Sequence, residues 1–144
     1  MRLFATFQRS SHFFFACFVS LVLLAFSGCG NSKSAPFALD ASDPTSVMEA
    51  VFTVARGEAP ASVLAQLCDP EGQNDADTRR ISAYSAGFDA DGEFPMFFAE
   101  GKINGDVIIL EDSADIPFLY GPNGTDVESM KMIRRDGKWY LFQF

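Results

Sequence analysis

Arg134-Arg135-Asp136-Gly137-Lys138-Trp139-Tyr140-Leu141 is the stretch of this 144-residue sequence that decides the expected fold. Its centre, residues 135–137, has the chemistry of a tight turn, because Asp and Gly tolerate turn conformations that other residues avoid. The turn separates two strand-like segments, residues 125–134 and 138–144. The sequence therefore predicts an antiparallel hairpin here.

Strand-like segments continue toward the N-terminus as far as residue 96. Asn104-Gly105 predicts a hairpin with a type I′ turn, in which both turn residues need a positive φ. Its arms would be residues 96–103 and 106–111, and a further strand would cover 114–120. Pro117 should lie at an edge or a bulge, because proline has no N–H to donate to a neighbouring strand. Together these segments predict a meander of about five strands.

Helix signals occupy the residues before this sheet. Asp43 followed by Pro44 is typical of a helix start and predicts a helix over 44–56, with Gly57 directly after its last residue. A second helix is expected over 60–68, and a third begins after the cap Asp77. The fold class is therefore α+β, with N-terminal helices packed on one face of an antiparallel sheet of about five strands.

The first 28 residues differ in composition from the rest. Residues 1–11 are polar and basic, residues 13–26 are apolar except for Ser20, and Ser27-Gly28-Cys29 supplies small residues before a cysteine. This order is typical of a secretory signal. The apolar run is shorter than the roughly 20 residues that a membrane span needs.

Residues 24–30, Leu24-Ala25-Phe26-Ser27-Gly28-Cys29-Gly30, resemble the lipobox of bacterial lipoproteins, although leucine is more usual at the place of Phe26. The resemblance implies that residues 1–28 are a signal peptide and that Cys29 receives a diacylglycerol. Residues 29–42 would form a flexible tether. Gly30 after the cysteine implies sorting to the outer membrane, with the protein facing the periplasm.

The helix-then-strand order and the closing residues 134–141 resemble small NTF2-like (cystatin-like α+β cone) lipoproteins of bacteria, over residues 43–144. The resemblance implies a curved sheet wrapped round a helix, with a cone-shaped pocket between them. Some members of this family use the pocket for isomerase or dehydratase chemistry, and many others bind or assemble. The residues that would line such a pocket are Tyr84, Phe97, Phe98, Tyr120, Met130, Met132 and Trp139.

Composition argues against most catalytic and nucleic-acid functions. The single histidine, His12, lies in the signal segment, so the rest of the chain has no imidazole for a catalytic pair or a usual zinc site. From Cys29 onward 9 Lys and Arg residues stand against 19 Asp and Glu residues, a net charge of −10, which disfavours nucleic-acid binding. No nucleotide-binding motif occurs, and no cofactor is expected.

Two acidic clusters and one cysteine are the remaining candidates for metal-binding or reactive residues. The clusters are Asp69, Glu71, Asp75 and Asp77, and then Asp89, Asp91 and Glu93. Neither matches an EF-hand, so no metal site is expected and solvated loops are favoured. Cys68 is the only cysteine of the expected domain, which favours a buried and inert thiol.

The expected function is a lipid-anchored envelope protein with a non-catalytic binding or assembly module. Its partners would be the membrane, through the anchor, and an apolar ligand or an envelope protein; a dimer could form through the open sheet face. The alternative is a small isomerase or dehydratase acting on an apolar ligand in the cone. Its carboxylate and tyrosine candidates would be Asp115, Glu100, Tyr84 and Tyr120.

Overall fold

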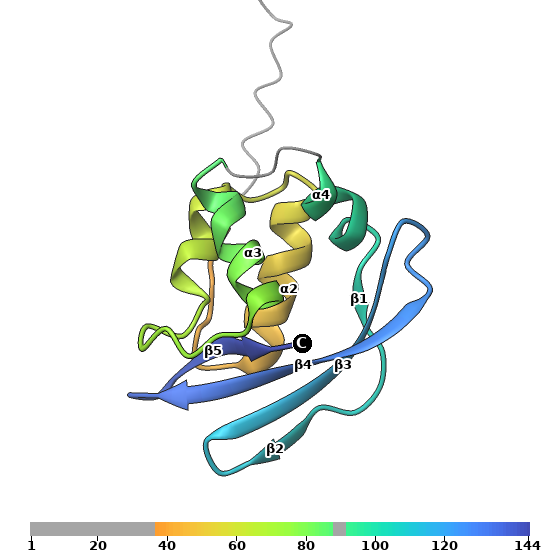
Figure 1. Cartoon of the computed structure of the whole chain (residues 1–144). Coiled ribbons are helices and arrows are strands. Elements are labelled where there is room, and N and C mark those ends of the chain that lie inside the picture. The colour runs from red at the N-terminus through yellow and green to blue at the C-terminus, as the bar shows by residue number, and fades with distance from the viewer. Residues whose placement is uncertain (1–36, 88–91) are drawn as a thin grey trace, which may run out of the picture. The chain divides into compact units, whose positions relative to one another are not determined.

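The computed structural model describes residues 37–87 and 92–144 (Figure 1). The predicted signal peptide, the lipidation at Cys29 and most of the tether lie outside these residues. The described part is an α+β fold with an open antiparallel sheet of five strands, so the predicted class is confirmed. Its elements in chain order are α2 (Pro44–Ala55), the 3₁₀ helix η1 (Ala61–Gln66), α3 (Ala76–Ser85), α4 (Glu93–Phe98), β1 (Lys102–Ile103), β2 (Ile108–Leu110), β3 (Ser113–Tyr120), β4 (Asp126–Arg135) and β5 (Lys138–Gln143).

The sheet is built on the long strand β3. Strand β4 pairs with one edge of β3, and β5 pairs with β4. The other edge of β3 is shared by two short strands: β1 pairs with residues 118–119 and β2 with residues 113–115. The predicted hairpin at residues 134–141 is confirmed, since Arg135 pairs with Lys138 across Asp136 and Gly137, whose φ angles are 50° and 77°.

The hairpin predicted at Asn104-Gly105 is wrong, because β1 and β2 both pair with β3 and not with each other. The Asn104 N–H instead donates to the carbonyl oxygen of Pro117 over 2.9 Å. In an antiparallel strand, the backbone nitrogen and carbonyl oxygen of one residue face the same neighbouring strand. The Pro117 nitrogen, which carries no hydrogen, therefore faces the gap between β1 and β2, where no strand residue needs a donor. Pro117 thus lies in an interior strand, opposite the gap between β1 and β2, and not in an edge strand or at a β-bulge as predicted.

The strand predicted from residue 96 is also wrong, because residues 93–98 form α4. Pro95 lies in the first turn of this helix, where a backbone N–H is not needed. Phe94 and Phe98, four residues apart, are both buried, and their rings lie 5.3 Å apart. Burying both rings on one helical face favours a helix over a strand here.

The three predicted N-terminal helices match the structure to different extents. The predicted helix 44–56 matches α2, whose cap Asp43 accepts a hydrogen bond from the N–H of Thr45. The second is only the short η1, because residues 67–69 leave the helix to bond with β5. The cap of α3 is Asp75 and not Asp77, since the Asp75 carboxylate accepts from the Thr78 N–H over 2.8 Å.

The core lies between the helices and one face of the sheet. Helix α2 is buried on almost every side, with Val47, Met48, Ala50, Val51 and Phe52 fully inaccessible. The described helices lie on the same side of the sheet (Figure 1). Alternation along β3 and β4 sends Ile116, Phe118, Met130 and Met132 into this core. The opposite face, called the open face below, carries the outward side chains of β2 to β5.

The N-terminal half of the fold covers the outer edge of β5. The N–H of Trp139 donates to the Ala41 oxygen, and the N–H of Leu141 donates to the Leu67 oxygen, each over 2.7 Å. In return, the Asp69 N–H donates to the oxygen of Leu141 over 3.3 Å. These bonds satisfy backbone groups that an edge strand would otherwise expose.

Candidate binding surface on the open face of the sheet

The open face carries exposed aliphatic side chains and a hollow lined by both apolar and charged residues. Ile108 and Leu110 of β2 and Val127 of β4 are 56%, 68% and 71% exposed, although all three are large aliphatic residues. An open depression of about 750 Å³ extends over strands β2 to β5. It is lined by Ile108, Leu110, Glu111, Asp112, Ser113, Ala114, Asp115, Lys131, Met132, Ile133, Arg134, Arg135 and Phe142.

One pair of opposite charges lies in the middle of this surface. Asp115 of β3 and Lys131 of β4 are directly opposite in the strand register, and both line the depression. Asp115 also accepts a hydrogen bond from the hydroxyl of Ser129. On either side along β3 and β4 the outward pairs are Ser113 with Ile133 and Pro117 with Ser129. The middle of the open face is therefore polar, and the exposed aliphatic residues lie to either side of it.

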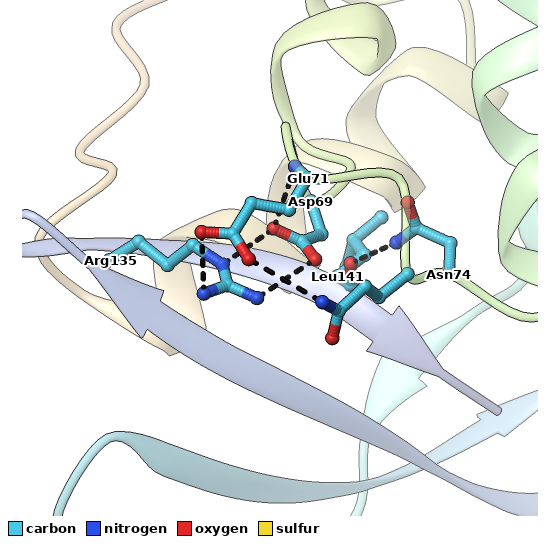
Figure 2. A network of polar contacts seen from close by, with 6 residues as sticks. Asp69, Glu71, Asn74, Arg135 and Leu141 are labelled. Atoms are coloured by element: carbon cyan, nitrogen blue, oxygen red, sulfur yellow. Dashed lines mark hydrogen bonds and ion pairs between the residues drawn. The ribbon is translucent and has the colours of Figure 1, made fainter.

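The two arginines at one end of the depression are held by carboxylates. Arg134 Nε lies 2.9 Å from Asp112 Oδ1, and its guanidinium carbon lies 5.3 Å from the centre of the Trp139 ring. Arg135 belongs to a larger network shown in Figure 2. Its Nε and Nη2 donate to Asp69 Oδ1 and Oδ2 over 2.7 and 3.2 Å, and Nη1 lies 3.0 Å from Glu71 Oε1.

The Asp69 carboxylate in this network is a structural group. Its side chain is fully buried, and the hydrogen bonds from Arg135 hold the pKa of Asp69 below its usual 3.8, against the opposing effect of burial. Close by, the Asn74 side-chain amide donates to the Leu141 oxygen over 2.6 Å (Figure 2). Residues 69–74 are thereby fastened to β4 and β5. A carboxylate that stays ionised through such pairing is poorly suited to act as a general acid.

The structure places the seven predicted pocket residues on the inner side of the fold. Phe98, Met130, Met132 and Trp139 belong to the buried core, and Tyr84, Phe97 and Tyr120 are partly buried against it. Aromatic contacts join several of them, such as Phe98 with Tyr120 at 6.1 Å between ring centres. Of the seven, Met132 alone borders the depression on the open face. Their role as a pocket lining stays a prediction.

The residues of the enzymatic alternative are not brought together. Asp115 points to the open face, whereas the Tyr120 ring packs on Phe118 and Phe98 on the inner side. Tyr84 stacks on Phe94, with ring centres 4.4 Å apart, and Glu100 is exposed after α4. The sheet thus separates Asp115 from both tyrosines, and no observation favours the isomerase or dehydratase alternative.

The acidic clusters have structural roles where they are described. In the first, Asp69 and Glu71 bind Arg135, Asp75 caps α3, and Asp77 pairs with Arg80 over 3.1 Å. In the second, Asp89 and Asp91 lie outside the described residues, and Glu93 begins α4. Within 37–87 and 92–144, no three carboxylate, cysteine or histidine side chains converge as metal ligands.

Cys68 is partly buried beside α3. Its Sγ donates to the Thr78 carbonyl oxygen over 3.6 Å, and burial raises the pKa of the thiol. A raised pKa lowers the thiolate fraction at neutral pH. This environment agrees with the expected inert thiol.

Sequence reasoning overlooked the residues that form the apolar part of the open face. A signal was present in Ile108-Ile109-Leu110, because three consecutive apolar residues on one strand must send side chains to both faces. In the part of the chain that the structure describes, no helix is long and apolar enough to cross a membrane. Comparison with family models, curated proteins and solved structures found no match to this chain.

Proposed function

We propose that this chain is a lipid-anchored protein of the bacterial envelope whose folded part is a non-catalytic binding or assembly module. The observation that carries the proposal is the exposure of Ile108, Leu110 and Val127 on one face that also holds a depression. Ile108 and Leu110 are neighbours on the same face of β2, and exposed apolar patches rimmed by polar residues mark interaction sites. The open face is the docking surface in this proposal.

The NTF2-like architecture is part of the same proposal. Helix α2 packs against β1, β3 and β5 on the inner face of an antiparallel sheet, the kind of arrangement that a cone needs. The helix-then-strand order from residue 43 onward supports it further. In such a fold the docking surface is the outer side of the cone, and the aromatic core fills its inner side.

The lipid anchor rests on residues 24–30 and on the position of Cys29. Processing there places the domain on the periplasmic side of the membrane, and Gly30 favours the outer membrane. Two or more acyl chains give stable attachment, because each buried methylene contributes about 0.8 kcal/mol. No membrane-spanning helix is then required for attachment.

Mass spectrometry of the protein isolated from membranes tests the anchor. We expect a mature N-terminus at Cys29 carrying acyl chains, and we expect Cys29→Ser to abolish both cleavage and membrane retention. Cys68→Ser is the matched control and should leave both unchanged. A soluble protein with an unmodified N-terminus would contradict this proposal.

Photo-crosslinking in intact cells tests the docking surface. A photoreactive phenylalanine analogue replaces Leu110 on the open face or, as a control, Arg80, whose side chain is 78% exposed on α3. We expect one discrete adduct from position 110 and none from position 80. Equal, diffuse labelling at both positions would refute a specific docking role for the open face.

A further inference from the structure

We propose that β2 is a docking edge, to which an extended segment of a different protein adds as a further strand of the sheet. The segment is apolar in its middle and basic at its ends. This inference rests on the docking role proposed above for Ile108 and Leu110, and it names the chemistry of their partner. The backbone groups, the side chains and the charges along β2 each support it.

The two outer edges of the sheet differ in how they are covered. The edge at β5 is closed by backbone bonds from the N-terminal half of the fold to Trp139 and Leu141. Among the described residues the edge at β2 has no such cover, because β3 is its strand partner and no backbone bond from outside the sheet reaches residues 108–110. Figure 1 shows β2 at the margin of the sheet and away from the described helices. An uncovered strand edge is a template for another strand.

The backbone groups that β2 offers at this edge belong to Ile109. The bond from Asn104 to Pro117 shows that odd-numbered residues of β3 direct their backbone groups toward β1 and β2. Ile108 and Leu110 lie opposite odd-numbered residues of β3 and therefore bond with that strand. Ile109 lies opposite an even-numbered residue and turns its N–H and C=O outward. An added strand would exchange two hydrogen bonds with it.

The side chains of β2 are apolar and exposed on both faces of the sheet. Ile108 and Leu110 lie on the open face, as described above. Ile109 lies on the face that carries the helices, since its register partner Ala114 is buried there, and yet it is 52% exposed. A strand beside β2 would place its own side chains next to these three residues. Aliphatic residues are therefore favoured in the middle of the added segment.

Acidic side chains lie at both ends of β2. Residues 102–112 hold Asp106, Glu111 and Asp112, and their single basic residue is Lys102. Asp112 pairs with Arg134 over 2.9 Å, whereas Asp106 and Glu111 are exposed and belong to no ion pair among the described residues. Basic residues at the ends of the added segment would complement these charges.

The same charges disfavour a second copy of this chain at the edge. Antiparallel pairing of two β2 strands would bring Asp106 of each copy beside the partner's Glu111 and the partner's Asp112. Parallel pairing would bring identical acidic ends together. Like charges opposite each other destabilise strand pairing, so the added strand belongs to a different protein.

A synthetic peptide of sequence Lys-Thr-Val-Ile-Val-Thr-Lys, with blocked ends and a fluorescent label, tests the edge. Its binding to the purified full-length chain in detergent is measured by fluorescence anisotropy, with empty micelles as the baseline. We expect saturable binding. The same peptide with Glu in place of both Lys residues should bind about tenfold more weakly or worse. Absence of saturable binding by the Lys peptide, or equal binding of the two peptides, would overturn the proposal.

Methylation of single peptide nitrogens separates strand addition from mere contact with apolar side chains. The N–H groups of the central Ile and of the next Val face opposite sides of an extended peptide, so only one of them can face Ile109. One methylation should therefore weaken binding about tenfold, and the other should change it less than about twofold. Equal effects of the two methylations would refute pairing through the backbone.

Ile109→Pro makes the matching change in the protein. It removes the outward N–H and leaves the bonds between β2 and β3 in place, which is how an edge strand tolerates proline. An unchanged urea midpoint would show that the variant is folded. Peptide binding should then fall at least about tenfold, whereas Ile109→Val, which keeps the N–H, should stay within about threefold of the unchanged chain.

Charge changes in the protein complete the test. Asp106→Lys should weaken binding of the Lys peptide and strengthen binding of the Glu peptide, whereas Asp77→Lys on α3, 53% exposed, should alter neither. Unchanged binding in Ile109→Pro or in Asp106→Lys would contradict the proposal.

The crosslinking experiment at position 110 distinguishes this proposal from the docking role on which it rests. An adduct that disappears in Ile109→Pro and persists in Ile109→Val supports strand addition. An adduct that persists in both variants would remove strand addition and preserve the docking role. Absence of the adduct together with absence of peptide binding would remove both.

Discussion

Phe118 is the residue whose truncation should damage the fold most. It is fully buried on β3, and its ring contacts four others: Phe52, Phe98, Tyr120 and Phe144, with ring centres 5.6 to 6.4 Å away. These neighbours come from α2, α4 and the sheet, so the surrounding elements cannot easily collapse into the space left by the ring. We therefore expect Phe118→Ala to lower the free energy of unfolding by about 4 kcal/mol, within the usual range of about 3–5 kcal/mol for loss of a buried aromatic ring.

Urea denaturation followed by the fluorescence of Trp139 measures this loss, because Trp139 is the single tryptophan and is buried in the same core. A loss of about 4 kcal/mol is a large part of the 5–15 kcal/mol typical of small domains. Phe118→Leu keeps part of the apolar volume and should cost about 1–2 kcal/mol. Val127→Ala on the open face is the control and should change stability by less than about 0.5 kcal/mol. The reasoning fails if Phe118→Ala costs no more than Val127→Ala.

Three further predictions concern other parts of the fold. The pKa of Asp69 is lowered in the folded state from its usual value of 3.8. The Asp69 carboxylate therefore stabilises the fold at pH values above 3.8 and loses this effect as the pH falls through its lowered pKa. Asp69→Asn should therefore lower the urea midpoint at pH 7. Below about pH 4 the urea midpoint should fall less steeply with pH in this variant than in the unchanged protein, and equal slopes would contradict the prediction. Gly101→Ala should cost about 1–3 kcal/mol in the same assay, because the added Cβ would contact the ring of Phe52; an unchanged midpoint would disprove the contact. In a variant without the two N-terminal cysteines, Cys68 should react slowly with a thiol reagent at pH 8 and quickly in urea, whereas fast labelling without urea would show an accessible thiol.

Local signals were sufficient where one short segment determines its own structure. Asp136 and Gly137 both adopt positive φ angles between paired strands, as their turn chemistry predicts. Helix α2 begins at a capped proline, again as predicted. In both places the deciding contacts join residues close in sequence, which a single sequence displays directly.

Long-range contacts overrode local signals elsewhere. Asn104-Gly105 has the chemistry of a hairpin, but the bond from Asn104 to Pro117 assigns β1 to β3 instead. Residues 60–68 look helical, but Leu67 leaves the helix to bond with Leu141. Strand partners of this kind depend on the whole fold and leave no local pattern.

The candidate site was missed for a related reason. Alternation shows that a strand has two faces, but it does not show which face the helices cover. Tyr120, Met130 and Trp139 are on the covered side, whereas Ile108 and Leu110 are not. Only the register of β2 on β3 reveals that Ile108 and Leu110 point to the open face.

The covering of β5 by the N-terminal half has a consequence for the order of folding. Asn74 reaches the Leu141 oxygen across 67 positions of the sequence, and Asp69 reaches Arg135 across 66. Such distant contacts require a large loop to close before they stabilise anything, which slows folding. Until residues 138–143 have been synthesised, neither η1 nor the loop 69–74 has the strand that holds it. These two segments therefore gain their tertiary hydrogen bonds only after β5 has been synthesised.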